Sequence, residues 1–235
     1  MLLLALDTCD SRGSIALLDE QKVLGESLHP ATEDFSSWLL PAVDALLSGN
    51  RVSHTDLGGY AVASGPGSFT GVRVGLTTAK AWAEVYEKPI YPVSRLRVLA
   101  QRAPLSSEYV AAFIDAQRKQ VFAAVYRRHS AEWALLGEER VIDPTEFFRL
   151  ATQTAGNSGI VWVTLDPEIL MASPMWNNQI PAATPILAVQ PPLASSIGLH
   201  ALEHLGRQET DAIALDANYV RRSDAEIFGK KVAVP

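Results

Sequence analysis

The sequence predicts an α/β protein made of two halves that repeat the same order of elements. Each half begins with three apolar strand-like segments, and the first of them ends in an acid, Asp7 in one half and Asp115 in the other. Helical segments with a 3.6-residue apolar period and further short strands follow in both. A chain of 235 residues can enclose two small cores. We expect the halves to span residues 1–103 and 104–235.

The first half is expected to contain strands at 2–6, 14–18, 22–28, 59–63 and 90–93, with helices at 35–47, 72–86 and 94–102. The second half is expected to contain strands at 109–115, 120–126, 132–136 and 160–164, with helices at 144–151 and 193–205. Asp143 precedes Pro144 and is a suitable N-cap for its helix. Residues 172–192 are predicted to form an irregular connection, and 230–235 a loose tail.

This duplicated βββαβα-type order is the plan of the actin-like, or ribonuclease-H-like, ATPases, whose halves face each other across a nucleotide cleft. On that plan Asp7 lies where metal-bound phosphate is held, and Asp115 is its counterpart across the cleft. Glycines between a strand and a helix fit the same picture. The stretch from Ser64 to Gly75 contains four of them, and the helix that follows offers free N–H groups to an anion.

That glycine-rich stretch has two interpretations. It is either a phosphate-type cradle or a tight connection between a strand and a helix. It is not a P-loop, since no Gly-Lys-Ser/Thr sequence ends it, and its glycine spacing differs from the Rossmann fingerprint.

Composition limits the function. The net charge of −6 argues against nucleic-acid binding by this chain alone, because phosphate contacts need clustered Lys and Arg. The single Cys9 excludes an internal disulfide and suggests a reducing compartment. The apolar start is too short for a signal peptide or membrane helix before it reaches Asp7. We expect a cytoplasmic protein.

The amino-acid sequence of the glycine-rich loop resembles that of the TsaB (YeaZ) family. Members of this family are the partner subunit in making threonylcarbamoyladenosine at position 37 of bacterial tRNA. Shorter matches occur at Leu4–Thr8, Leu39–Pro41, Ile114–Ala116 and Tyr219–Arg221. The resemblance implies a protein without its own chemistry that binds a TsaD-type catalytic transferase, joined by a TsaE-type ATPase. The resemblance also implies a homodimer as a possible assembly. It implies that tRNA is contacted only through the complex, and no cofactor is expected.

The turn after Asp115 departs from the family pattern. Gln117 replaces an Arg, Lys119 a Gly and Gln120 a Glu. Long side chains crowd this turn, so its backbone N–H groups cannot cradle phosphate in the way a glycine turn does. We therefore interpret a set of residues as a vestigial nucleotide or phosphate loop, with no catalytic residue among them: Asp7, Thr8, Gly65, Gly67, Thr70, Gly71 and Asp115.

Metal and thiol chemistry are not expected. The catalytic relative carries a His-xxx-His pair on a first-half helix, whereas residues 35–47 contain no histidine. A His-xxx-His does occur at His200 and His204, where two imidazoles could share an ion. Both are expected at the solvated margin of their helix, without a further ligand nearby. Cys9 has no neighbouring base or cation in sequence and is expected to be a small apolar side chain.

The helices of the first half are apolar on more than one side, which indicates either deep burial or a partner. In the TsaB family these helices form a bundle with the catalytic subunit or with a second copy. The predicted interface residues are Phe35, Trp38, Leu39, Ala42, Gly75, Ala79 and Ala83.

Two other classes of function stay open. One is an actin-like-fold ATP-dependent phospho- or acyltransferase using Asp7 and Asp115. The other is an independent nucleotide-binding regulator, which would need an intact cleft.

Overall fold

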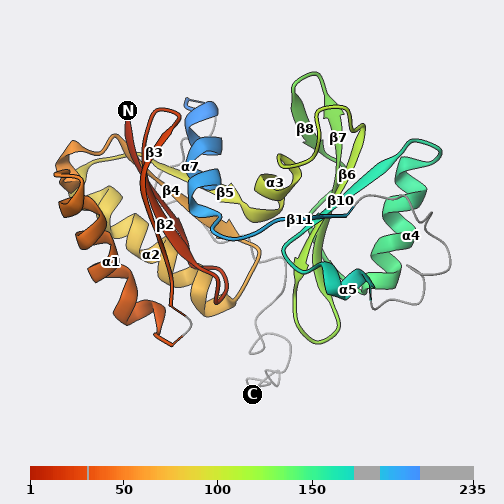
Figure 1. The fold of residues 1–235 in the computed structure, drawn as a ribbon, viewed down its shortest axis with the longest axis horizontal. Coiled ribbons are helices and arrows are strands. Elements are labelled where there is room, and N and C mark those ends of the chain that lie inside the picture. The colour runs from red at the N-terminus through yellow and green to blue at the C-terminus, as the bar shows by residue number, and fades with distance from the viewer. Residues whose placement is uncertain (31, 172–185, 207–235) are drawn as a thin grey trace, which may run out of the picture.

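The computed structural model describes residues 1–30, 32–171 and 186–206. It contains two sheets that lie side by side with helices between and outside them (Figure 1). In the first sheet the strands follow the order β3-β2-β1-β4-β5, and these are β1 (Leu2–Asp7), β2 (Ser14–Asp19), β3 (Lys22–Leu28), β4 (Gly59–Gly65) and β5 (Ile90–Ser94).

The second sheet repeats this order. Its strands run β11-β10-β6-β7-β8, and these are β6 (Tyr109–Asp115), β7 (Val121–His129), β8 (Glu132–Leu135), β10 (Ile160–Thr164) and β11 (Ile186–Ala188). In both sheets the first three strands form an antiparallel meander. β4 or β10 then pairs in parallel with the open side of the first strand, and β5 or β11 pairs in parallel with that added strand. The duplicated α/β plan predicted from the sequence is confirmed.

The helices cover both sides of the first sheet. α1 (Phe35–Gly49) and α2 (Phe69–Tyr86) lie outside it, and η1 (His54–Asp56) connects α1 to β4. α3 (Arg95–Ala100) lies between the sheets and contacts strands of both. α4 (Pro144–Ala155) and α5 (Pro167–Met171) belong to the second half. Among the described residues, no helix is long and apolar enough to cross a membrane.

One element of the second half packs on the first. α7 (Ala194–Glu203) lies against β1, β2, β4 and β5, on the side that faces the second sheet (Figure 1). Gly198 allows this, because a Cβ there would lie 2.4 Å from a methyl carbon of Leu18. The sequence does not reveal this crossing, and the division at residue 103 stays a prediction.

Most predicted elements are confirmed to within a few residues. The Asp143 carboxylate caps α4 as expected, by accepting the N–H groups of Thr145 and Glu146. The sequence does not predict β9 (Arg140–Ile142), a short strand beside β7, and it does not predict β11 or α5. These three elements have five residues or fewer, which is too short for a periodic pattern to show. The predicted tail at 230–235 lies outside the described residues.

The core is continuous across the halves. One buried cluster combines residues of both sheets with α2, α3 and α7. A second cluster fills the space between the second sheet and α4, where Phe147 and Phe148 pack on the ring of Trp162. The two halves therefore share a hydrophobic interface and fold against each other.

Candidate functional site

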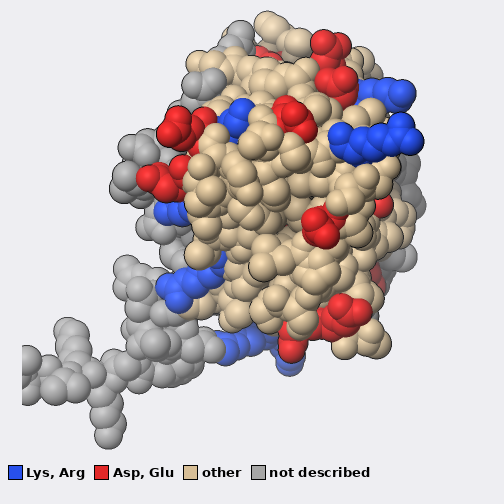
Figure 2. Space-filling model, turned by 90° about the vertical axis from the view of Figure 1, so that its left-hand side faces the viewer, with Lys and Arg blue, Asp and Glu red and all other residues tan. Residues whose placement is uncertain are grey.

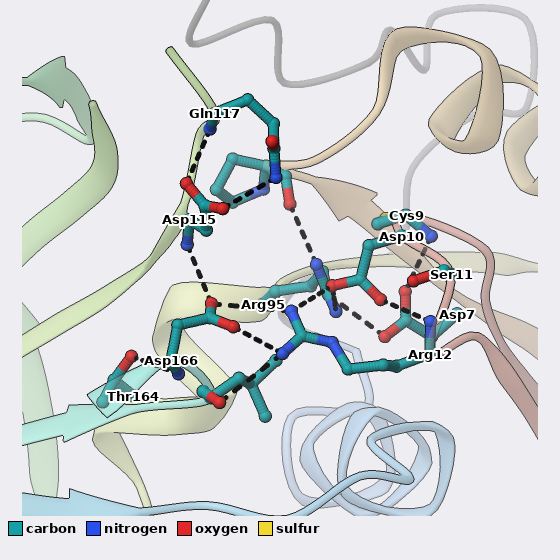
Figure 3. Close-up of polar contacts among 12 residues, drawn as sticks. Asp7, Cys9, Asp10, Ser11, Arg12, Arg95, Asp115, Gln117, Thr164 and Asp166 are labelled. Atoms are coloured by element: carbon teal, nitrogen blue, oxygen red, sulfur yellow. Dashed lines mark hydrogen bonds and ion pairs between the residues drawn. The ribbon is translucent and has the colours of Figure 1, made fainter. Parts of the chain in front are cut away.

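Three acids gather between the halves because the carboxyl ends of their strands meet there. Asp7 ends β1, Asp115 ends β6, and Asp166 follows β10 by two residues. β10 pairs in parallel with β6, so both strands deliver their last residues to the same edge. The predicted meeting of Asp7 and Asp115 at the junction of the halves is seen, but other residues stand between them (Figure 3).

Arg95 occupies the position beside Asp7. It is the first residue of α3, and its side chain is inaccessible to solvent. Its Nε donates to Asp7 Oδ2 at 3.0 Å, and its Nη2 donates to Asp10 Oδ2 at 2.8 Å. The other Asp7 oxygen, Oδ1, accepts the backbone N–H of Cys9 at 3.0 Å. Both oxygens of Asp7 are therefore engaged by the chain itself.

Arg12 extends the network across to the second half. It lies in the β1–β2 turn, where its Nη2 donates to Asp10 at 2.7 Å and its Nη1 to Asp166 Oδ1 at 2.6 Å. The second oxygen of Asp166 accepts the backbone N–H of Asp115 at 2.8 Å. Figure 3 shows the resulting path, in which carboxylates and guanidinium groups alternate from Asp7 to Asp166 and the backbone N–H of Asp115 makes the last link.

The electrostatics follow from burial and pairing. Burial by itself would lower the pKa of the Arg95 guanidinium, but the charges of Asp7 and Asp10 outweigh it and hold that pKa above its ordinary value. Burial would likewise raise the pKa of Asp10, and the cations Arg95 and Arg12 reverse this and lower it well below 3.8. Arg95 and Asp10 therefore stay charged, and each is paired with oppositely charged side chains of the network.

The side chain of Asp115 turns back to its own loop. Its Oδ1 accepts the backbone N–H of Gln117 at 2.7 Å, and its Oδ2 accepts the Gln117 side-chain amide at 2.7 Å. Three consecutive residues of this turn have positive φ: +61° at Gln117, +56° at Arg118 and +60° at Lys119. A side chain in the left-handed region costs about 1–2 kcal/mol relative to glycine. The turn is thus both crowded and strained.

The glycine-rich loop packs directly on the chain after β1. A Cβ at Gly71 would lie 2.1 Å from the Thr8 carbonyl oxygen, and a Cβ at Gly67 would lie 2.4 Å from that of Cys9. Thr8 Oγ1 donates to the Gly71 carbonyl at 2.6 Å, and the Ser68 N–H donates to the Cys9 carbonyl at 2.6 Å. These are the contacts of a tight connection, and they require close approach rather than positive φ. Phosphate binding by this loop stays a prediction.

The other two predicted loop residues lie apart from these contacts. Gly65 has φ of +114° and pairs with Ser94 at the end of β4. Thr70 is exposed in the first turn of α2.

Cys9 lies under the loop and is fully buried. Its sulfur is 3.6 Å from the Ala63 carbonyl oxygen. Burial, followed by the nearby Asp7 charge, raises the pKa of the thiol well above its ordinary value. A protonated, enclosed thiol is a poor nucleophile, in line with the small apolar role expected from the sequence.

The predicted place of His200 is wrong. The sequence pattern put it at a solvated helix margin, whereas the side chain is 2% exposed because α7 is enclosed by the first sheet and by α3. Its Nδ1 lies 2.8 Å from Gln101 Nε2, and burial lowers its pKa to about 3. His204 is half-buried, and Glu203, which the sequence analysis overlooked, completes a group of three possible ligands.

The residues predicted for a partner interface are mostly enclosed by this chain. Trp38, Leu39, Gly75, Ala79 and Ala83 are buried, and Phe35 and Ala42 are half-buried. Gly75 shows the cause, since a Cβ there would lie 2.4 Å from Thr8 Oγ1. These side chains pack the helices onto the sheet, and their part in any interface stays a prediction.

Sequence reasoning missed four members of the ion-pair network: Asp10, Arg12, Arg95 and Asp166. Two signals were available. Arg95 opens a helix whose following residues are largely apolar, and Asp166 follows its strand almost as Asp7 and Asp115 end theirs. Nothing local indicates that Arg12 reaches the second half.

Comparison with known proteins places the chain. A family model described as "TsaD: tRNA N6-adenosine threonylcarbamoyltransferase" matches residues 27–217. The Escherichia coli (strain K12) "tRNA threonylcarbamoyladenosine biosynthesis protein TsaB" is 33% identical over 168 residues, covering 70% of this chain and 71% of that protein. The chain belongs to the TsaB (YeaZ) family. A TsaB of Bacillus subtilis (strain 168) is 38% identical over 127 residues, which cover 54% of this chain and 56% of that relative.

Solved structures agree with the assignment to the TsaB family. "YeaZ from Pseudomonas aeruginosa" superposes with a TM-score of 0.70 at 28% identity, covering 91% of this chain and 96% of that one. Component A of (R)-2-hydroxyglutaryl-CoA dehydratase from Acidaminococcus fermentans gives a TM-score of 0.51 at 10% identity, covering 86% and 98%. At that identity the likeness concerns the fold alone, which is the duplicated actin-like fold.

Proposed function

We propose that this TsaB-family chain is a non-catalytic scaffold or activator subunit in the biosynthesis of threonylcarbamoyladenosine at position 37 of tRNA. The observation that carries the proposal is the pairing of Arg95 with Asp7 and Asp10. In an actin-like ATPase the first-strand acid must face metal-bound phosphate, and here a buried guanidinium stands in its place. A nucleotide would have to displace a buried ion pair, and breaking such a pair costs about 3–5 kcal/mol.

The other half of the cleft supports the same proposal. Asp115 accepts two hydrogen bonds from Gln117, and the turn carries long side chains where phosphate binding favours glycine. In addition, α1 has the sequence FSSWLLPAVDALLSG, with no histidine for the metal pair of the catalytic relative. The chain therefore lacks, in its first-half helix, the ligands on which the transferase chemistry of the catalytic relative depends.

We place the partner surface on the outer side of α1 and α2. Figure 2 shows this side of the molecule as a largely uncharged face, with charged residues mostly towards its edges. Leu40 on α1 is 55% exposed and Val85 on α2 is 71% exposed. Further exposed and uncharged residues at helical spacing are Ser37, Pro41 and Ala45 on α1, and Thr70, Thr77 and Ala81 on α2. A largely uncharged face of this kind is typical of an interface core.

The partner we assign to this face is a TsaD-type catalytic subunit, with a second copy of the chain as the alternative occupant. A TsaE-type ATPase would complete the assembly. The net charge of −6 leaves tRNA binding to the complex rather than to this chain. The alternative function, an ATP-dependent phospho- or acyltransferase, requires Asp7 to be released from Arg95.

Reconstitution tests the proposal. Alone, the chain should neither hydrolyse ATP nor modify tRNA, and with TsaD- and TsaE-type partners it should restore threonylcarbamoyl transfer. Ala81→Arg places a charge on the proposed face and should abolish capture of the TsaD-type subunit. Thr152→Arg on the exposed side of α4 is the matched control and should leave capture intact.

Three outcomes would refute the proposal. One is ATP turnover by the isolated chain that Asp7→Asn abolishes while the circular dichroism stays native. Another is full transferase activity of the partners without this chain. Equal capture by the Ala81→Arg and Thr152→Arg variants would place the interface elsewhere.

A further inference from the structure

A cavity lies away from the ion-pair network, between α3, α7 and the β7–β8 hairpin. It has a volume of about 470 Å³. His200 and Glu203, from the last turn of α7, and His204, the residue that caps the C-terminus of this helix, lie along its wall. One ligand atom from each of these residues lies within 4.8 Å of the others. Positions i and i+3 share one helix face, so the backbone of α7 holds His200 and Glu203 together, and the ring of His204 is held beside them by its contact with the His200 carbonyl oxygen.

The orientation of His204 leaves a lone pair available. Its Nδ1 lies 2.8 Å from the backbone carbonyl oxygen of His200. A carbonyl oxygen can only accept, so Nδ1 carries the proton, and in the neutral imidazole Nε2 then carries the lone pair. Metal-bound histidines are held in this way, with the far ring nitrogen donating to a carbonyl or a carboxylate.

His200 has a buried ring nitrogen that lacks a partner. Its Nδ1 is next to the Gln101 side-chain amide, but its Nε2 is buried and makes no hydrogen bond within the described part of the chain. The two ends of a glutamine amide can exchange places by rotation. If the Gln101 side-chain oxygen accepts from His200 Nδ1, then His200 Nε2 carries a lone pair and can act as a metal ligand. Binding an ion would satisfy this buried nitrogen.

Glu203 is equally unengaged. Its carboxylate makes no hydrogen bond or ion pair with any described residue, although three arginines line the same cavity. Those arginines contact other groups: Arg97 donates to the Trp133 carbonyl, Arg102 to Ser196 Oγ, and Arg128 stacks on the Trp133 ring. The end of a helix also favours a positive charge, because the last carbonyl groups point towards it.

We propose that His200, Glu203 and His204 bind one divalent transition-metal ion, with Zn²⁺ as the best match. Two imidazoles and a carboxylate form a three-ligand set that Zn²⁺ accepts at about 2.0–2.2 Å, with its fourth position open. Because the three residues line the cavity together with the arginines, water or a small anion in the cavity would complete the coordination. The site is separate from the network around Asp7 and does not depend on the function proposed above.

Metal binding by the untagged full chain tests this site. After dialysis against chelator, the chain should take up one equivalent of Zn²⁺ by isothermal titration, and Co²⁺ should give visible absorption bands of a tetrahedral or five-coordinate ion. Loss of a supporting partner around a metal typically costs 10–100-fold in affinity, so His204→Ala and Glu203→Gln should each weaken binding by at least about tenfold. The matched controls are His129→Ala and Glu84→Gln, both at exposed positions, which should bind as the parent does.

Glu203→Gln keeps the test independent of folding, because this residue is exposed and Gln preserves its shape. Binding that persists unchanged in both ligand variants would overturn the proposal. Absence of Zn²⁺ and Co²⁺ uptake by the parent would overturn it as well. Titration with inorganic phosphate tests whether the cavity binds an anion. If phosphate stabilised the chain and no metal were taken up, the cavity would be an anion site and the metal proposal would be wrong.

Discussion

Arg95 and Asp7 form an ion pair that solvent does not reach, with side chains 1% and 0% exposed and 3.0 Å between Nε and Oδ2. Asp10 and Arg12 continue the pair to the surface of the junction, and Asp166 carries it into the second half. The acid that the fold plan assigns to phosphate chemistry is therefore the buried end of a network that reaches the second half through the Arg12–Asp166 pair.

Arg95→Met should lower the free energy of unfolding by about 3–5 kcal/mol, because it leaves Asp7 charged and unpaired in the interior. Arg127→Met is the control, since Arg127 pairs with Glu108 at the surface with half of its side chain exposed, and such pairs contribute about 0–1 kcal/mol. Urea unfolding of both variants measures the difference. Equal losses in the free energy of unfolding would show that the buried pair stabilises the fold no more than the surface pair does.

Asp10 should make the stability of the folded chain depend on pH in the acidic range. Its pKa is lowered in the folded chain, so its ionised form adds stability that is complete above its ordinary value of 3.8 and is lost as the pH falls through the folded value. Asp10→Asn should be less stable than the parent near neutral pH and should lose less stability below about pH 4. Thermal unfolding across this range measures the effect. Parallel pH profiles for the two proteins would contradict the assignment.

Gly71→Ala should lower stability by about 1–3 kcal/mol, because the added Cβ overlaps the Thr8 carbonyl oxygen and overpacking of this kind carries such a cost. Gly159→Ala is the control, since a Cβ there meets no atom within 4 Å. Differential scanning calorimetry compares the two. If Gly71→Ala melted like the parent and lost nucleotide binding instead, the loop would be a ligand site.

Lys119→Gly should stabilise the chain by about 1 kcal/mol, because glycine relieves the left-handed backbone at the end of the second turn. For a chain of this length that corresponds to a rise in Tm of about 2–4 °C. Lys119→Ala should give no such gain, since alanine keeps the Cβ that strains the conformation. A gain from alanine equal to that from glycine would show that the lysine side chain, not the backbone, is the source of the strain.

The sequence by itself determined the duplicated fold and most of its elements. The apolar strands of each half, the capping Asp143 and the strand-end acids Asp7 and Asp115 are local patterns, and local patterns are what a single sequence displays. The amino-acid sequence of the glycine-rich loop and several shorter matches indicated the TsaB family, which the comparisons confirm.

Only the tertiary structure decided which side chains meet. Arg95 and Asp7 are 88 residues apart, and Arg12 and Asp166 are 154 residues apart. The burial of His200 depends on α7 crossing back to the first sheet, and no spacing within its own helix reveals that. Contacts of this kind form where the two halves pack together. An unpaired charge is costly once it is buried, so a buried charged side chain is paired with an oppositely charged one from another element.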